Sequence, residues 1–280
     1  MNILYLVAIV LGMSAQDITK KVFNQKSSAV YLFTAVTTLF ALLFFVATAG
    51  PMEWTFSLLP YSLAFAVSYG LATVCSVIAF SCGSLSLTTL IISYSLMLPT
   101  IYGLIFLHEP IGAGFIPGLV LLIISLVLIN KRSESVPITP KWIISLALAF
   151  IGNGACSIAQ KVQQTAFEGA YKNEFMILAL AFVILALVIM SFKAERPQMT
   201  HSLRCGWWLC LICGIMNGMV NLFVMILSGR MAVSIMFPII SAGGIIVTSL
   251  IAMTVYRERL SRRQLIGLGL GIVTVILLNL

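Results

Sequence analysis

Long apolar stretches alternate with short polar connections along nearly the whole chain. A helix needs about 20 mostly apolar residues to cross the hydrocarbon core of a bilayer. Ten stretches of this kind lie at residues 3–22, 29–49, 57–81, 85–107, 112–130, 141–162, 173–192, 205–228, 233–254 and 262–279. The pattern predicts an all-α integral membrane protein with ten transmembrane helices.

Composition agrees with this prediction. Apolar residues make up 61% of the chain, charged residues only 9%, and the mean hydropathy is +1.11. Soluble domains carry about 25% charged residues, so water is not the main solvent of this chain. The ten stretches leave no room for an extramembrane domain, and the longest polar connection predicts a linker at residues 131–140.

The second half of the chain repeats the first. Residues 106–130 align without a gap with residues 255–279, and the alignment pairs Glu109 with Glu258, Gly118 with Gly267 and Asn130 with Asn279. Residues 12–25 align in the same way with residues 152–165. We therefore expect two five-helix repeats, at residues 1–130 and 141–280. Since five is an odd number, the second repeat must be inverted in the membrane, an arrangement that transporters use to place a site between their halves.

The basic residues predict an orientation. With ten spans, all but three of the 16 lysines and arginines lie on the side of the 1–2, 5–6, 7–8 and 9–10 connections. Lysine and arginine accumulate on the cytoplasmic side of membrane proteins. We expect a multi-pass protein of the cytoplasmic membrane with both termini outside the cytoplasm, and the net charge of +8 needs no nucleic acid to explain it.

Several other functions are disfavoured. The six cysteines show no metal-ligand spacing and the two histidines, His108 and His201, fall in connections, so we expect no metal site and no cofactor. No Walker motif is present to bind ATP. No histidine lies at membrane depth to support enzymatic chemistry, and we expect a protein that is not an enzyme.

The chain resembles the EamA-type proteins of the drug/metabolite transporter superfamily. Each half begins with small residues that lead to a lysine, in SAQDITKK and GACSIAQK, and ends with a glutamate before a glycine-containing span, in HEPIGAGFIPG and RERLSRRQLIG. The resemblance covers the whole chain. It implies a ten-helix secondary transporter that exports or exchanges small solutes by alternating access.

Three charged residues on the first and sixth spans are candidates for coupling or gating. Asp17 and Lys21 share one helix face with Ser14, and Lys161 repeats the position of Lys21. A charge within hydrocarbon is costly, so Asp17 should face the interior and find a partner, for which Lys20 and Lys21 are near enough. One interpretation makes Asp17 a proton-coupling or ammonium-binding group and the lysines gates or carboxylate anchors. In the other, the lysines reach opposite membrane interfaces and Asp17 neutralises a neighbour.

Candidate substrate-binding residues lie on the third, fourth and eighth spans. Asn217 and Asn221 are one turn apart on the eighth span, and the third span turns polar at Ser68 and Tyr69. Tyr94 follows Ser93 on the fourth span, where its ring and hydroxyl suit a polar solute. Helix-to-helix hydrogen bonding is the competing explanation for these side chains.

Two prolines are candidates for gating, and two glutamates have a structural interpretation. Pro99 and Pro238 interrupt the fourth and ninth spans, where each can let a gating helix bend. Glu109 and Glu258 each precede a span and are read as caps of the next helix, with Gly118 and Gly267 as paired motif positions.

The expected substrate is a small polar metabolite, either amino-acid-like or another zwitterion or anion. A carrier for amines or cationic drugs is one alternative, because Asp17 and the tyrosines suit a cation. A membrane scaffold or receptor that transports nothing is the alternative from another class. The expected partners are a small-molecule solute and the lipid bilayer, and a monomer is compatible with each of these functions.

Overall fold

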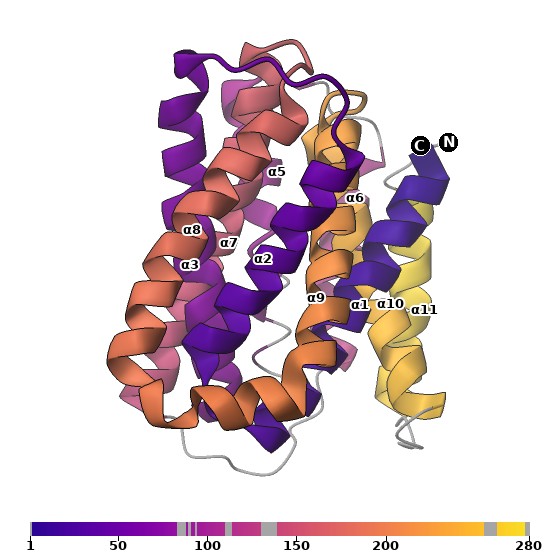
Figure 1. Cartoon of the computed structure of the whole chain (residues 1–280). Helices are drawn as coiled ribbons and strands as arrows, with labels where there is room; N and C mark the ends of the chain where they lie inside the picture. Colours follow the sequence, from indigo (N-terminus) through magenta and orange to yellow (C-terminus); the bar gives the residue numbers. More distant parts are fainter. Residues whose placement is uncertain are drawn as a thin grey trace.

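The computed structural model describes residues 2–82, 88, 91–92, 94–109, 114–129, 139–254 and 262–277 (Figure 1). Over these residues every regular element is a helix. The elements are α1 (Asn2–Lys26), α2 (Val30–Thr48), η1 (Phe56–Leu58), α3 (Leu59–Cys82), α5 (Met97–Phe106), α6 (Phe115–Ile129), α7 (Pro140–Ala166), α8 (Lys172–Ala194), η2 (Arg196–Gln198), α9 (Met199–Ser228), α10 (Val233–Thr254) and α11 (Arg262–Leu277).

Six of these helical stretches are long and apolar enough to cross a membrane, namely α1, α2, α3 with η1, α7, α8 and α9 with η2. Three shorter apolar helices lie at Met97–Phe106, Phe115–Ser125 and Val233–Gly244. Large apolar side chains remain exposed on the long helices, as Val67 does at 72% and Leu185 at 62%. The protein is therefore a multi-pass, all-α membrane protein, and ten spans remain a prediction.

Helix ends differ by a few residues from the predicted stretches. α1 continues to Lys26 and α9 begins already at Met199, before the predicted start at 205. Hydropathy underestimates both helices because their ends carry polar residues such as His201. α7 starts at Pro140, with the Thr139 side chain accepting a hydrogen bond from the backbone of Trp142. The rest of the predicted linker, residues 131–138, lies outside the described part of the chain.

The packing partners of the helices correspond between the two halves of the chain. α1 packs on α9 as α7 packs on α3, and α2 packs on α9 as α8 packs on α3. α1 also meets α10 as α7 meets α5, while α2 with α8 and α6 with α11 are pairs of equivalent helices. Exchanging each helix for its counterpart therefore reproduces these pairs of neighbours.

Connections predicted to share a membrane side also lie together. The Ser27 and Ser202 hydroxyls are 2.6 Å apart, and the Glu195 carboxylate accepts hydrogen bonds from the backbone N–H groups of Tyr31 and Leu32. These contacts join the α1–α2 connection to the α8–α9 connection. Both connections belong to the lysine- and arginine-rich side that the sequence assigns to the cytoplasm.

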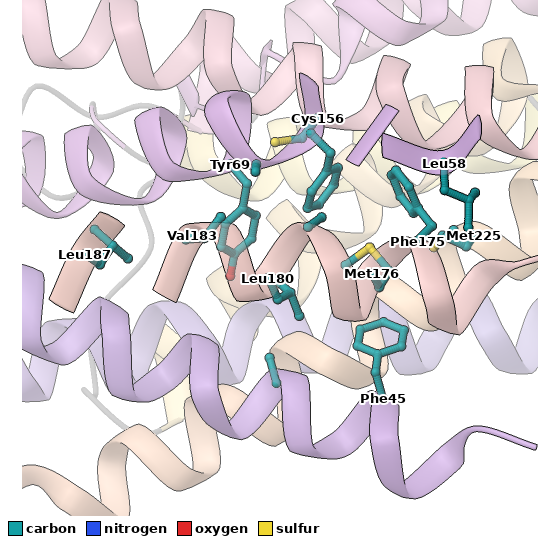
Figure 2. Packing of buried hydrophobic residues seen from close by; sticks show 14 of the residues in the cluster. Phe45, Leu58, Tyr69, Cys156, Phe175, Met176, Leu180, Val183, Leu187 and Met225 are labelled. Atoms are coloured by element: carbon teal, nitrogen blue, oxygen red, sulfur yellow. The ribbon is translucent and has the colours of Figure 1, made fainter. Parts of the chain in front are cut away.

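Two buried apolar clusters flank the centre of the molecule. One is built by α2, α3 and α8, and Figure 2 shows its aromatic and aliphatic side chains interleaved, including Phe45, Phe175 and Met176. The other joins α1, α9 and α10 through residues such as Ile9, Leu227 and Phe237. The cavity between the helices that carry these clusters is lined by both polar and apolar side chains.

Two equivalent glycines allow close helix approaches around this centre. A Cβ at Gly12 would lie 2.7 Å from Val220 on α9, and a Cβ at Gly152 would lie 2.8 Å from the Ser68 carbonyl oxygen and the Ala72 nitrogen on α3. Val220 and Ala72 hold corresponding positions in the two halves. Small residues at such contacts let transmembrane helices approach each other closely.

Gly152→Ala is expected to destabilise the fold by about 1–3 kcal/mol, because the added methyl group meets backbone atoms that cannot move aside independently. Gly70→Ala is the matched control, since a Cβ at Gly70 has no neighbouring atom within 4 Å. Thermal unfolding in detergent should show a lower midpoint for Gly152→Ala than for Gly70→Ala. Equal midpoints would contradict the close α3–α7 approach.

Candidate functional site: a polar cavity between the halves

A cavity of about 170 Å³ lies between α1, α3, α7, α9 and α10 and the segment that precedes α5. Its wall contains one acidic, one basic and five amide side chains, together with hydroxyl groups. The polar lining residues are Gln16, Asp17, Lys20, Tyr69, Thr73, Ser76, Asn153, Ser157, Gln160, Asn217 and Asn221. The cavity therefore offers both signs of charge and many hydrogen-bonding groups inside an apolar protein.

The two halves line the cavity through the same helical positions. On α1 the lining residues are Met13, Gln16, Asp17 and Lys20, and on α7 they are Asn153, Cys156, Ser157 and Gln160, with identical spacing. On α3 they are Tyr69, Ala72, Thr73, Ser76 and Phe80, and on α9 they are Asn217, Val220, Asn221 and Val224, so the first four α3 positions have the same spacing as those of α9. Equivalent faces of equivalent helices thus meet at one cavity.

A hydrogen-bond network centred on Asn217 joins the helices around the cavity. The Tyr69 hydroxyl donates to Asn217 Oδ1 over 2.9 Å, and Asn217 Nδ2 donates to Gln16 Oε1 over 3.0 Å. Asn221 Nδ2 contacts Asn217 Oδ1 at 3.2 Å, while Asn221 Oδ1 accepts from Gln160 Nε2 over 2.9 Å. The network connects α1, α3, α7 and α9, and so spans both halves.

Some groups on the cavity wall keep hydrogen-bonding capacity. Gln16 uses its Oε1 in the network, which leaves Nε2 without a partner among the described residues, and Gln160 correspondingly leaves Oε1. Asn153 donates from Nδ2 to Ser95 Oγ over 2.7 Å, which leaves its Oδ1. One side of the network therefore offers a donor and the other offers acceptors to a molecule between them.

Asp17 lines the cavity as an ion pair. Its Oδ1 lies 3.5 Å from Lys20 Nζ, one turn further along α1. Both side chains retain access to the cavity, with 35% of Asp17 and 23% of Lys20 exposed. Lys20 is therefore the cationic partner that was expected for Asp17. The side chain of Lys21 lies outside what the structure describes.

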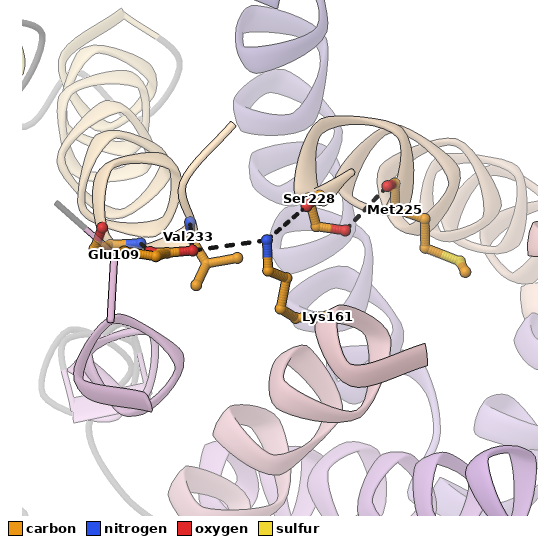
Figure 3. Close-up of polar contacts among 6 residues, drawn as sticks. Glu109, Lys161, Met225, Ser228 and Val233 are labelled. Carbon is orange, nitrogen blue, oxygen red and sulfur yellow. Dashed lines mark hydrogen bonds and ion pairs between the residues drawn. The ribbon is translucent and has the colours of Figure 1, made fainter. Parts of the chain in front are cut away.

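Lys161 does not line the cavity. Its Nζ lies 3.6 Å from Glu109 Oε1 and donates to the Ser228 carbonyl over 2.9 Å, so the lysine is held by partners inside the protein (Figure 3). Among the described residues, the Glu109 carboxylate accepts the backbone N–H groups of Val233 and Ser234. It therefore caps the start of α10, a helix from the other half of the chain.

Other candidate residues lie away from the cavity wall. Ser68 is half-buried and donates to the Ala64 carbonyl, Tyr94 is half-buried, and Pro99 is buried within α5. Pro238 lies inside α10, which continues through it, next to the lining residue Phe237. Ser93 and Glu258 lie outside the described residues.

Gly118 and Gly267 are both buried on α6 and α11, which pack together. The Ser125 hydroxyl donates to the Gly267 carbonyl over 2.6 Å. The paired glycines therefore lie on two equivalent helices that pack together, and Gly267 takes part in a hydrogen bond between them.

Sequence reasoning missed several lining residues, above all Gln16, Asn153 and Gln160. It placed the important face of α1 at Ser14, Asp17 and Lys21, whereas Ser14 is buried and donates to the Val10 carbonyl. The sequence did contain a signal for Gln160. The alignment of residues 12–25 with 152–165 pairs Lys20 with Gln160. Equivalent polar residues at equivalent positions mark the shared cavity face.

Comparisons with known proteins identify the fold only. No family model and no curated protein matches the chain. Solved structures do match, in 28 chains. One of them, described only as the crystal structure of a protein, superposes with a TM-score of 0.76 over 98% of this chain and 94% of its own, at 12% sequence identity. At 12% identity the likeness establishes a shared fold and carries no information about activity.

Proposed function

We propose that the protein is a secondary transporter that moves a small polar metabolite across the cytoplasmic membrane by alternating access. The observation that carries the proposal is the polar cavity enclosed by equivalent helix faces of the two halves. In transporters built from repeats, the substrate site lies at the repeat interface near the middle of the membrane. An enzyme or a purely structural bundle has no need of such a matched pair of cavity walls.

The proposed architecture has ten transmembrane helices in two inverted five-helix repeats of the EamA type. The corresponding helix neighbours and the identical spacing of lining residues support two related halves. Inversion follows from five spans in each half. Two halves of this kind can exchange conformations, so that the cavity opens first to one side of the membrane and then to the other.

The cavity favours a solute that is small and electrically neutral overall. A volume of about 170 Å³ is below the ~300–1,000 Å³ of pockets for drug-sized molecules. Because Asp17 and Lys20 neutralise each other, a zwitterion can satisfy both charges, whereas an ion of either sign leaves one charge uncompensated. An amino-acid-like zwitterion therefore fits better than a cationic drug, and export or exchange is the expected direction of use.

The proposed orientation places both termini outside the cytoplasm. The α1–α2 and α8–α9 connections lie together and carry Lys26, Lys193, Arg196 and, at the start of α9, Arg204. Lys26 also lies over the Trp208 ring at 5.3 Å, a contact suited to the edge of a membrane. This basic end is assigned to the cytoplasmic side.

Ligand binding to the purified protein tests the proposal. Zwitterionic amino acids are expected to raise the apparent melting temperature, since a ligand that binds only the folded state stabilises it by mass action. Amines, nucleosides, sugars and organic anions form the comparison set. Stabilisation by cationic amines alone would favour the alternative carrier, and no stabilisation by any class would favour a scaffold or receptor.

A further inference from the structure

A cluster of charged and backbone groups lies at one end of the cavity. Lys161 Nζ on α7 contacts Glu109 Oε1 at 3.6 Å and the Ser228 carbonyl at the end of α9 at 2.9 Å. Glu109 in turn accepts the N–H groups of Val233 at 3.0 Å and Ser234 at 2.9 Å. Figure 3 shows these contacts running from the start of α10 through Glu109 and Lys161 to Ser228.

This cluster lies directly beyond the cavity wall on three helices. Lys161 follows the lining residue Gln160 on α7. Ser228 is one turn beyond the lining residue Val224 on α9, and Val233 is one turn before the lining residue Phe237 on α10. A solute that left the cavity between these helices toward the α9–α10 turn would pass beside this cluster.

We propose that Glu109, Lys161 and Ser228 form a latch that closes the cavity on the side of the α9–α10 turn, and that the cavity opens to that side when the Glu109–Lys161 pair separates. The proposal rests on the transport function proposed above. The latch ties α7 to the ends of α9 and α10, so its rupture frees the three helices that border this exit.

The charges of the latch are well placed to give two discrete states. The side chains are only 14% and 10% exposed for Lys161 and Glu109, and each charge is satisfied by the other and by backbone groups. Separation requires that both charges find water, which becomes available when the exit opens. A closed dry state and an open wet state are therefore both possible, with few intermediates between them.

The absence of a side chain at Gly103 leaves space for the Glu109 carboxylate. A Cβ at Gly103 would lie 2.6 Å from Glu109 Oε2 and 2.7 Å from a Val233 methyl group, and the Gly103 carbonyl accepts the Glu109 backbone N–H over 3.2 Å. Gly103→Ala therefore displaces the carboxylate without removing a charge. This substitution breaks the latch independently of Glu109→Gln and Lys161→Met.

The test uses a reporter thiol one turn inside the latch. Val224→Cys is introduced into the full chain, which is reconstituted in vesicles, and a membrane-impermeant maleimide is added on the side of the α9–α10 turn. Modification of residue 224 is measured by mass spectrometry of its peptide, which distinguishes it from the six native cysteines. The variants Glu109→Gln, Lys161→Met and Gly103→Ala are each compared with the latch-intact reporter protein.

We expect each latch variant to raise the rate of modification by about tenfold, since loss of one partner destabilises a buried charge pair. Lys161→Arg retains the charge and should leave the rate near that of the intact latch. Glu195→Gln is the matched control, because Glu195 caps the start of α2 through two N–H groups but lies away from the cavity. It should leave the rate unchanged.

Unchanged modification in the latch variants that fold would overturn the latch, as would an equal increase in Glu195→Gln. If Lys161→Met fails to fold, Glu109→Gln and Gly103→Ala decide the result. The measurement uses no solute, so its failure is distinguishable from failure of the transport proposal. If modification increases in the latch variants but a separate assay finds no transported solute, the latch is retained and the transport proposal is rejected.

Discussion

Asn217→Leu is expected to abolish solute binding and to lower the free energy of unfolding by about 2–4 kcal/mol. The substitution removes the side-chain partner of the Tyr69 hydroxyl, of Gln16 Oε1 and of one Asn221 contact. Hydrogen bonds between membrane helices contribute about 0.6–1.7 kcal/mol each, and leucine supplies no replacement. Asn221 keeps its bond to the Asn217 carbonyl, so the helix itself should remain intact.

Ser68→Ala provides the control for this result. Ser68 is next to Tyr69 in sequence, but it does not line the cavity, and its side chain bonds to the Ala64 carbonyl of its own helix. Unfolding in detergent and ligand-induced stabilisation should both stay near wild type in Ser68→Ala. Retained binding in Asn217→Leu, or equal losses in the two variants, would contradict the central place of Asn217.

Asp17→Asn is expected to weaken solute binding by more than tenfold and to destabilise the protein by about 1 kcal/mol. The substitution leaves the Lys20 charge beside the cavity without its carboxylate partner, and removes the group assigned to a solute ammonium. The stability term is kept small because both side chains are partly exposed to the cavity.

A double substitution separates these two effects. Asp17→Asn with Lys20→Met removes both charges and should recover most of the lost stability, since no unpaired charge remains. Binding should not recover, because the solute has lost both of its charged contacts. Stability and ligand affinity are measured for all four proteins of this cycle. Additive stability losses, or restored binding in the double variant, would show that the pair does not act as described.

The helical membrane architecture could be predicted from the sequence because hydropathy depends on local composition. Phe56–Cys82 and Lys172–Ala194 illustrate this, since each has an uninterrupted apolar stretch where the prediction placed a span. The short helix Met97–Phe106 illustrates the limit. It is shorter than a span needs, and residues 85–87, 89–90 and 93 of the predicted span lie outside the described part of the chain, so the fourth span stays a prediction.

The orientation of individual side chains was harder to predict. Asp17, Tyr69, Asn217 and Asn221 all line the cavity, whereas Ser68 does not, although it adjoins Tyr69. Neighbouring residues on a helix point about 100° apart, so a polar run does not specify which member faces inward. Their role in solute binding stays a prediction.

Contacts between distant segments were beyond local sequence reasoning. Glu109 was assigned to the helix that follows it, yet it caps α10, more than a hundred residues later in the chain. Lys161 likewise finds its partners on two other segments. Such pairs depend on how the halves are assembled, which no local pattern of residues encodes.

Solute flux through the reconstituted protein tests the transport function most directly. Vesicles containing the protein and an internal amino acid mixture are placed in labelled zwitterionic amino acids, and uptake is compared with that of protein-free vesicles. We predict saturable uptake of at least one zwitterion, retained in Ser68→Ala and lost in Asn217→Leu. Uptake no faster than in protein-free vesicles, for every solute class and with folded wild-type protein, would contradict the proposed transporter.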